Sequence, residues 1–136
     1  MHTRGTFSPR TEAEARDRYD QLGPVAQTVV REVTKAMDFD REEYGERVTP
    51  AVVEQAKNAL FASLLAVSVG SREEFDDWRA SHDGAVVVLG GENVDNVAWH
   101  APPFAGGVAA TFQDEEHAAV ETLRRQAFGR IYWNLL

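Results

Sequence analysis

The chain has 136 residues, with 22 Asp plus Glu against 14 Lys plus Arg and a formal net charge of −8. Its length fits one domain, residues 1–136, and 43% hydrophobic with 10% aromatic residues argues against disorder. The absence of Cys excludes disulfides, thiolate metal ligands and thiol nucleophiles. The sequence also lacks the apolar core of a signal peptide and any apolar run of about 20 residues, which predicts a soluble, cytoplasmic protein with no membrane segment.

The first half of the chain is predicted to be helical. Residues 1–10 are expected to be mobile, and residues 11–62 to form helices. A capping box from Thr11 to Glu14 begins the first helix, and Gly23-Pro24 is predicted to end it and begin the next. The second helix has a strong amphipathic pattern, because its apolar residues recur at three- and four-residue spacing: Ala26, Val29, Val30, Val33, Ala36 and Met37.

Two further helices are predicted before residue 63. Asp40 can cap a short helix in which Phe39 contacts Tyr44. Thr49-Pro50 begins a longer one, whose buried face is predicted to be Val52 or Val53, Ala56, Leu60 and Leu64.

Residues 63–136 mix sheet and helix. Residues 64–69 fit a strand, but the preceding helix can equally run through them. Ser71 begins a capped helix that carries Phe75 and Trp78 on one face. Strands are predicted at 86–89, 94–99 and 107–112, followed by a long C-terminal helix capped by Asp114. The predicted class is therefore α+β, with a helical N-terminal half and a small, mostly antiparallel sheet packed with helices.

The basic residues are unusual in kind. Only Lys35 and Lys57 are Lys, and the other 12 of the 14 basic residues are Arg. A GC-rich genome would favour Arg over Lys, but codon bias does not explain the surplus of carboxylates. A strongly acidic surface keeps a protein dispersed at high salt, which favours a halophilic source.

Several blocks of sequence carry a family resemblance. These are residues 23–33, 40–44, 71–78 and 122–130, together with Asn93-Val94-Asp95 and Val97-Ala98-Trp99-His100. With them the chain resembles a small uncharacterised family of haloarchaeal proteins, a domain of unknown function. The resemblance spans nearly the whole chain and implies no activity, substrate or catalytic residue.

No stretch matches a catalytic or nucleotide-binding motif, so no cofactor is predicted. His82, His100 and His117 all lie in the sheet half, where they could meet and hold Zn or Mn. None of them has a partner at close ligand spacing, and separate structural roles are the alternative.

The segment 93–104 is the first candidate for a functional surface. It places Asn93, Asp95, Trp99 and His100 next to Pro102-Pro103, so the aromatic side chains could stack on a small ligand. The alternative is that Trp99 belongs to the core and that His100 is its outward-facing neighbour on a strand.

The C-terminal helix is the second candidate. Arg124, Arg125 and Trp133 lie in a stretch that is locally basic, and they could contact an acidic partner. The favoured hypothesis is a non-enzymatic interaction or regulatory module that binds an unknown protein or itself, with nucleic acid not expected. The alternative is a small enzyme or metal-binding protein with its site around His100.

Overall fold

A computed structural model describes residues 1–37 and 40–136 and confirms the predicted α+β class. Its mixed sheet has the order β1-β2-β4-β5-β3, and neighbouring strands are antiparallel except β3 and β5, which are parallel. The strands are β1 (His2–Arg4), β2 (Val67–Ser71), β3 (Val86–Leu89), β4 (Asn96–His100) and β5 (Gly107–Phe112). The ranges predicted for β3 and β5 are confirmed to the residue.

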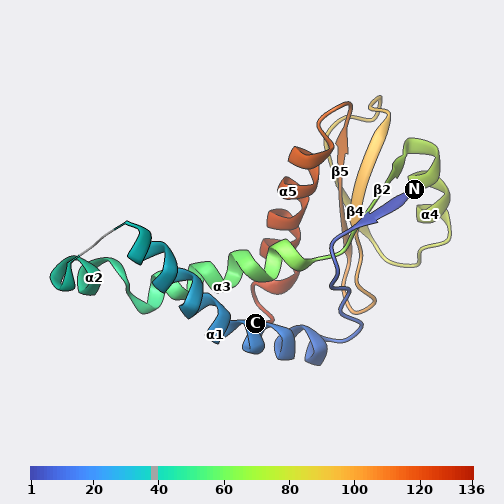
Figure 1. Cartoon of the computed structure of the whole chain (residues 1–136). Coiled ribbons are helices and arrows are strands. Elements are labelled where there is room, and N and C mark those ends of the chain that lie inside the picture. Colours follow the sequence, from blue (N-terminus) through green and yellow to red (C-terminus); the bar gives the residue numbers. More distant parts are fainter. Residues whose placement is uncertain (38–39) are drawn as a thin grey trace.

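Helices cover both faces of the sheet. The helices are α1 (Glu12–Ala36), α2 (Arg41–Arg47), α3 (Pro50–Leu64), α4 (Arg72–Ala80) and α5 (Glu116–Ala127). A π-helical turn, Phe128–Tyr132, continues α5. Helix α4 packs on one face and α5 on the other, while α1 and α3 lie side by side and extend away from the sheet with α2 at their far end (Figure 1). We call α1, α2 and α3 the arm.

The predicted break at Gly23-Pro24 is wrong, because α1 runs unbroken through Pro24. Pro24 cannot donate a backbone hydrogen bond, which costs stability inside a helix. The residues buried on either side of it nevertheless share one face, and α3 packs against both halves. That common face is Ala15, Tyr19, Leu22, Ala26, Val30 and Thr34.

The ambiguity at residues 64–69 is resolved, since α3 ends at Leu64 and β2 begins at Val67. The start of the chain, expected to be mobile, forms β1 instead and pairs with β2. Gly5 then turns the chain with a φ of +98°, and a Cβ at this position would overlap the Leu65 carbonyl oxygen. Sequence periodicity cannot detect a strand of three residues that ends at such a turn.

Most predicted helix starts are confirmed by hydrogen bonds. Thr11, Asp40 and Thr49 each accept a backbone N–H through the side chain, and Ser71 forms a full capping box with Glu74. Asp114 was predicted to cap the last helix, but that helix begins after Glu115, which makes no side-chain cap. The predicted contact of Phe39 with Tyr44 lies outside the described residues.

The core has one part at the base of the arm and one on each side of the sheet. On the α5 side, Val67, Ala98 and Val108 pack against Val120 and Leu123. On the α4 side, Phe75 packs against Trp99. The long C-terminal helix and the helical N-terminal half are thus broadly as predicted, although the sheet also includes β1.

Phe61 of α3 is the centre of the core at the base of the arm. It is fully buried, and four aromatic rings contact it edge-on at centroid distances between 5.1 and 6.0 Å: Phe7, Tyr19, Phe128 and Tyr132. These rings come from three segments, the N-terminal segment, α1 and the π turn, so Phe61 joins the arm to the N-terminal segment and to the π turn.

No helix of the described residues is both long and apolar enough to cross a membrane.

We expect Phe61→Ala to lower the free energy of unfolding by roughly 3–5 kcal/mol, because it leaves a cavity among four rings. Urea denaturation at constant KCl measures the change. Val87→Ala, at an exposed position on β3, is the control and should change stability by less than about 0.5 kcal/mol. A loss below about 1 kcal/mol for Phe61→Ala would contradict its central position.

Candidate functional site

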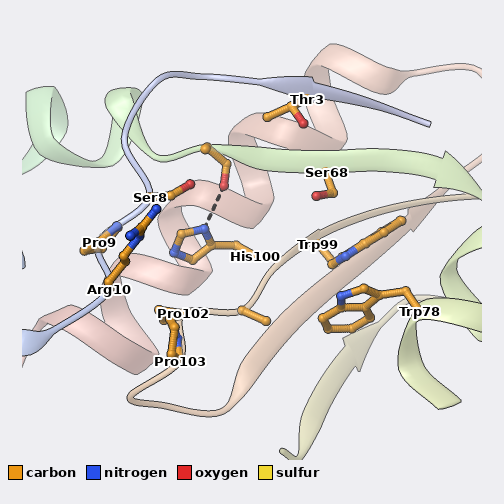
Figure 2. A pocket seen from close by; sticks show the side chains of 12 residues that line it. Thr3, Ser8, Pro9, Arg10, Ser68, Trp78, Trp99, His100, Pro102 and Pro103 are labelled. Atoms are coloured by element: carbon orange, nitrogen blue, oxygen red, sulfur yellow. Dashed lines mark hydrogen bonds between the residues drawn. The ribbon is translucent and has the colours of Figure 1, made fainter. Parts of the chain in front are cut away.

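The candidate site is a cavity of about 300 Å³ where the end of β4 meets the N-terminal segment. Backbone hydrogen bonds between Phe7 and the carbonyl of Leu64 and amide of Ala66 place Ser8–Arg10 beside the end of β4. In Figure 2 the two Trp side chains lie at one end of the cavity, and Ser8–Arg10 lie with the Pro102-Pro103 loop at the other. The lining residues are Thr3, Ser8, Pro9, Arg10, Ala66, Ser68, Trp78, Trp99, His100, Ala101, Pro102 and Pro103.

His100 is buried, so the expectation that it faces outward as the neighbour of Trp99 is wrong. Strand alternation points it to the face opposite Trp99, and there the π turn covers it with Tyr132. Its Nδ1 donates to the Ala66 carbonyl at 2.8 Å, because a carbonyl can only accept. Its Nε2 therefore accepts from the Tyr132 hydroxyl at 2.7 Å.

The surroundings of His100 keep its ring neutral. Burial lowers the pKa of His100 below its usual value; the hydrogen bond to the Ala66 carbonyl opposes this, and the positive charge of Arg124 adds to the lowering. Burial likewise raises the pKa of Tyr132, so its hydroxyl keeps its proton and remains a donor. Since both ring nitrogens of His100 are engaged within the chain, neither is open to a metal or a substrate proton.

Trp99 is both a core residue and a wall of the cavity. It is 3% exposed, and its ring lies 5.3 Å from Phe75 and 5.6 Å from Trp78. Trp78 is half-buried, and its other contacts are a stacked Phe75 at 5.9 Å and a stacked His82 at 4.5 Å. Trp99 is therefore a core residue that also lines the cavity, and its use as a platform for a ligand stays a prediction.

Asn93 and Asp95 lie outside this cavity. They belong to the turn that leads into β4, at the opposite end of the strand from His100. Asn93 is exposed, and the Asp95 carboxylate accepts a hydrogen bond from Gln113. The structure therefore separates the predicted segment 93–104 into a structural turn and a cavity wall.

The three candidate residues at the C-terminal end of the chain differ in exposure and in contacts. Arg124 is 9% exposed, and its guanidinium donates to the Leu65 carbonyl at 3.1 Å and to Glu121 at 3.2 Å. Arg125 is exposed, and Trp133 is 62% exposed beside Phe128. Arg124 therefore links α5 to the segment between α3 and β2 through the Leu65 carbonyl, while Arg125 and Trp133 are exposed at the surface.

The three sheet-half histidines have separate partners. His82 stacks on Trp78, His117 lies 3.1 Å from an Arg4 nitrogen, and His100 contacts Ala66 and Tyr132. Within residues 1–37 and 40–136, no group of three or more His, Asp or Glu side chains is arranged to hold a metal ion.

A second candidate surface lies on the arm, where sequence reasoning did not place a site. Val29, Val33 and Met37 of α1 lie beside Val52 and Ala56 of α3 along a groove of about 360 Å³. Thr34, Val30 and Arg47 complete its lining. The amphipathic pattern over residues 26–37 predicted this apolar stripe, but α3 covers only the Ala26 and Val30 side of it.

Several cavity residues were missed from the sequence. Thr3, Ser8, Arg10 and Ser68 line the cavity, but they come from the segment expected to be mobile and from a strand left ambiguous. Phe7-Ser8-Pro9 was the available signal, because an aromatic residue and a proline favour an anchored, extended segment.

Comparison with known proteins gives a family but no activity. A family model described as "Family of unknown function (DUF5809)" matches residues 6–133. Searches of curated proteins and of solved structures found no match. The predicted domain of unknown function is thereby confirmed, and the haloarchaeal origin stays a prediction.

The neutral His100 ring makes stability depend on pH. Because the folded pKa of His100 lies below its usual value of 6.5, the stability that the neutral ring contributes is fully present above about pH 6.5 and is lost as pH falls towards the folded pKa. The loss is about 1.4 kcal/mol for each pH unit over which only the unfolded ring is protonated. His100→Gln keeps a donor and an acceptor but cannot titrate, so its unfolding free energy should fall less between pH 7 and 5. Urea denaturation at constant KCl measures both proteins, and equal pH slopes would contradict the assignment.

Proposed function

The chain belongs to this family of unknown function, and we propose that it is a halophile-adapted, cytoplasmic, non-enzymatic interaction module that pairs with a second copy of itself through the arm. The observation that carries the proposal is the uncovered apolar face of α1 and α3. The engagement of both His100 ring nitrogens within the chain supports a non-enzymatic role over an enzyme centred there.

Exposed apolar side chains gather on the arm. Nine large hydrophobic side chains are exposed in the described residues, and six of them lie between residues 25 and 52. Val25, Val29 and Val33 follow one another at four-residue spacing on α1, which puts them on one helix face. A continuous apolar face of this kind on a two-helix layer is stable when a second layer covers it.

The charges around the groove favour a second copy as the occupant. The two helical stretches that carry it, residues 24–37 and 50–58, hold three basic residues and two acidic ones, a net of +1 in a chain of −8. Both Lys of the chain, Lys35 and Lys57, lie here. Two copies can therefore join these faces without the like-charge repulsion that opposes contact elsewhere, and a two-fold pair would form a four-helix bundle.

The distribution of carboxylates supports salt adaptation. Every Asp and Glu in the described residues is exposed except Glu116, which is half-buried. Few of them have a basic partner within salt-bridge distance in the described part of the chain: Glu12, Glu32, Glu74, Glu116 and Glu121. Unpaired surface carboxylates repel one another, and the Debye length of about 3 Å in molar salt screens that repulsion.

The first prediction concerns self-association. At molar KCl the protein should sediment as a dimer, and the double change Val29→Glu and Val33→Glu should raise the dissociation constant by roughly a hundredfold or more, because each dimer would bury four carboxylates. Sedimentation velocity over a range of concentrations measures it.

Val87→Glu is the matched control, since Val87 is 43% exposed on β3, away from the arm, and should leave the dimer intact. Urea midpoints of both variants check that α1 remains folded. A wild-type protein that stays monomeric, or a double variant that still pairs, contradicts the proposal.

The second prediction concerns salt. The thermal unfolding midpoint should rise from low salt to molar KCl, because screening removes carboxylate repulsion in the folded state. A flat or falling midpoint over this range would leave codon bias as the explanation of the Arg-rich composition.

A further inference from the structure

The cavity at the end of β4 has an unusual charge for this protein. None of its twelve lining residues is Asp or Glu, although Asp and Glu make up 22 of the 136 residues of the chain. The lining does include one basic residue, Arg10. His100 adds no charge because burial lowers its pKa, while the positive Arg124 lies close enough to contribute to that lowering. The lining of the cavity is thus positive in a chain with net charge −8, and the carboxylate of Glu14 accepts a hydrogen bond from the Arg10 backbone amide.

The cavity also contains hydrogen-bond donors that nothing in the described part of the chain satisfies. The indole N–H of Trp99 has no hydrogen-bond acceptor among the described residues. The side chain is only 3% exposed, but its indole nitrogen is not fully buried. The Arg10 guanidinium has no partner among the described residues either, since only the Arg10 backbone amide bonds to Glu14. A nearly buried donor that opens into a cavity is where a ligand acceptor would bind.

The hydroxyl groups of Ser8 and Ser68 add two further groups that can donate to an anion. Both residues line the cavity, and neither side chain is hydrogen-bonded within residues 1–37 and 40–136. Figure 2 shows Ser68 near the Trp99 end of the cavity and Ser8 near His100.

Aromatic rings form the other wall. Trp99 and Trp78 lie 5.6 Å apart at 35°, and Phe75 packs on both of them from the core side. These contacts fix the indole rings before any ligand arrives, so binding would cost little side-chain ordering. Because Trp99 is 3% exposed and Trp78 is already stacked on His82 and Phe75, a planar ligand ring would pack against the indole edges that reach the cavity.

We infer that this cavity binds a small organic anion made of a single planar ring with one carboxylate, with the ring on the Trp99 side and the carboxylate at Arg10. A volume of about 300 Å³ is at the lower end for small-molecule sites and fits one ring. The planar guanidinium of Arg10 matches one carboxylate in a bidentate contact. A single charge also suits the site better than a doubly charged phosphate, because the rest of the protein repels anions.

The composition of the chain allows a direct optical test. It has three Trp, and Trp133 is the one that does not line the cavity. In a Trp133→Phe background, fluorescence excited at the indole absorption edge therefore reports on Trp78 and Trp99 alone. The probes are benzoate and its neutral analogue benzamide, titrated at one constant KCl concentration.

Benzoate should change the fluorescence saturably, and benzamide should bind roughly tenfold or more weakly because it cannot form the charge-assisted contact. Arg10→Gln should weaken benzoate by roughly the same factor and leave benzamide unchanged. Arg125→Gln is the matched control, because Arg125 is exposed on α5 outside the cavity and should not alter either titration.

Unsaturable or equal titrations with the two probes overturn the inference, and so does an Arg125→Gln effect as large as that of Arg10→Gln. Urea midpoints confirm that each variant is folded. The titration does not depend on self-association through the arm, because the cavity and the groove share no lining residue. The two proposals are therefore tested independently.

Discussion

The arrangement of this protein depends on one buried side chain, Tyr132. Its ring packs edge-on against Phe61 at 5.1 Å, and its hydroxyl donates to His100 at 2.7 Å. The first contact ties the C-terminal π turn to the arm, and the second ties it to the sheet. Because the hydroxyl keeps its proton when buried, His100 is held as a neutral acceptor, and its Nδ1 in turn orders the chain at Ala66. Tyr132 therefore fixes the base of the arm and, through His100, one residue of the cavity lining.

This anchoring leaves the far part of the arm without cover. Each face of the sheet has a helix, α4 or α5, whereas beyond Phe61, within the described residues, the helices α1 and α3 pack mainly against each other (Figure 1). A two-helix layer buries one stripe of each helix, but α1 carries a second stripe at Val25, Val29 and Val33. Exposed carboxylates cover much of the remaining surface, and this apolar face with its neighbouring Lys residues is therefore the one that we propose for pairing with a second copy.

Local signals predicted most elements, and long-range contacts account for what they missed. Caps at Asp40, Thr49 and Ser71 and the β-branched run of β3 depend on near neighbours, so the sequence alone identified them. The continuity of α1 through Pro24 instead depends on α3, and β1 depends on pairing with β2. The burial of His100 and Arg124 likewise depends on partners far along the chain, Tyr132 and Leu65. The predicted site segment 93–104 therefore contained the five consecutive lining residues from Trp99 to Pro103, but not Arg10 and Ser68, which line the same cavity.

The most direct test of the account is disulfide cross-linking between the arms. The chain has no Cys, so Val29→Cys and Val87→Cys each introduce a single thiol at an exposed position. Val29 is the middle residue of the valine stripe, so in a two-fold pair whose axis passes through the centre of the stripe it lies close to its own counterpart. On mild oxidation at molar KCl the account predicts rapid formation of a covalent dimer for Val29→Cys and slow, concentration-dependent formation for Val87→Cys. Equal rates for the two variants would show that the arm is not the surface through which this protein pairs.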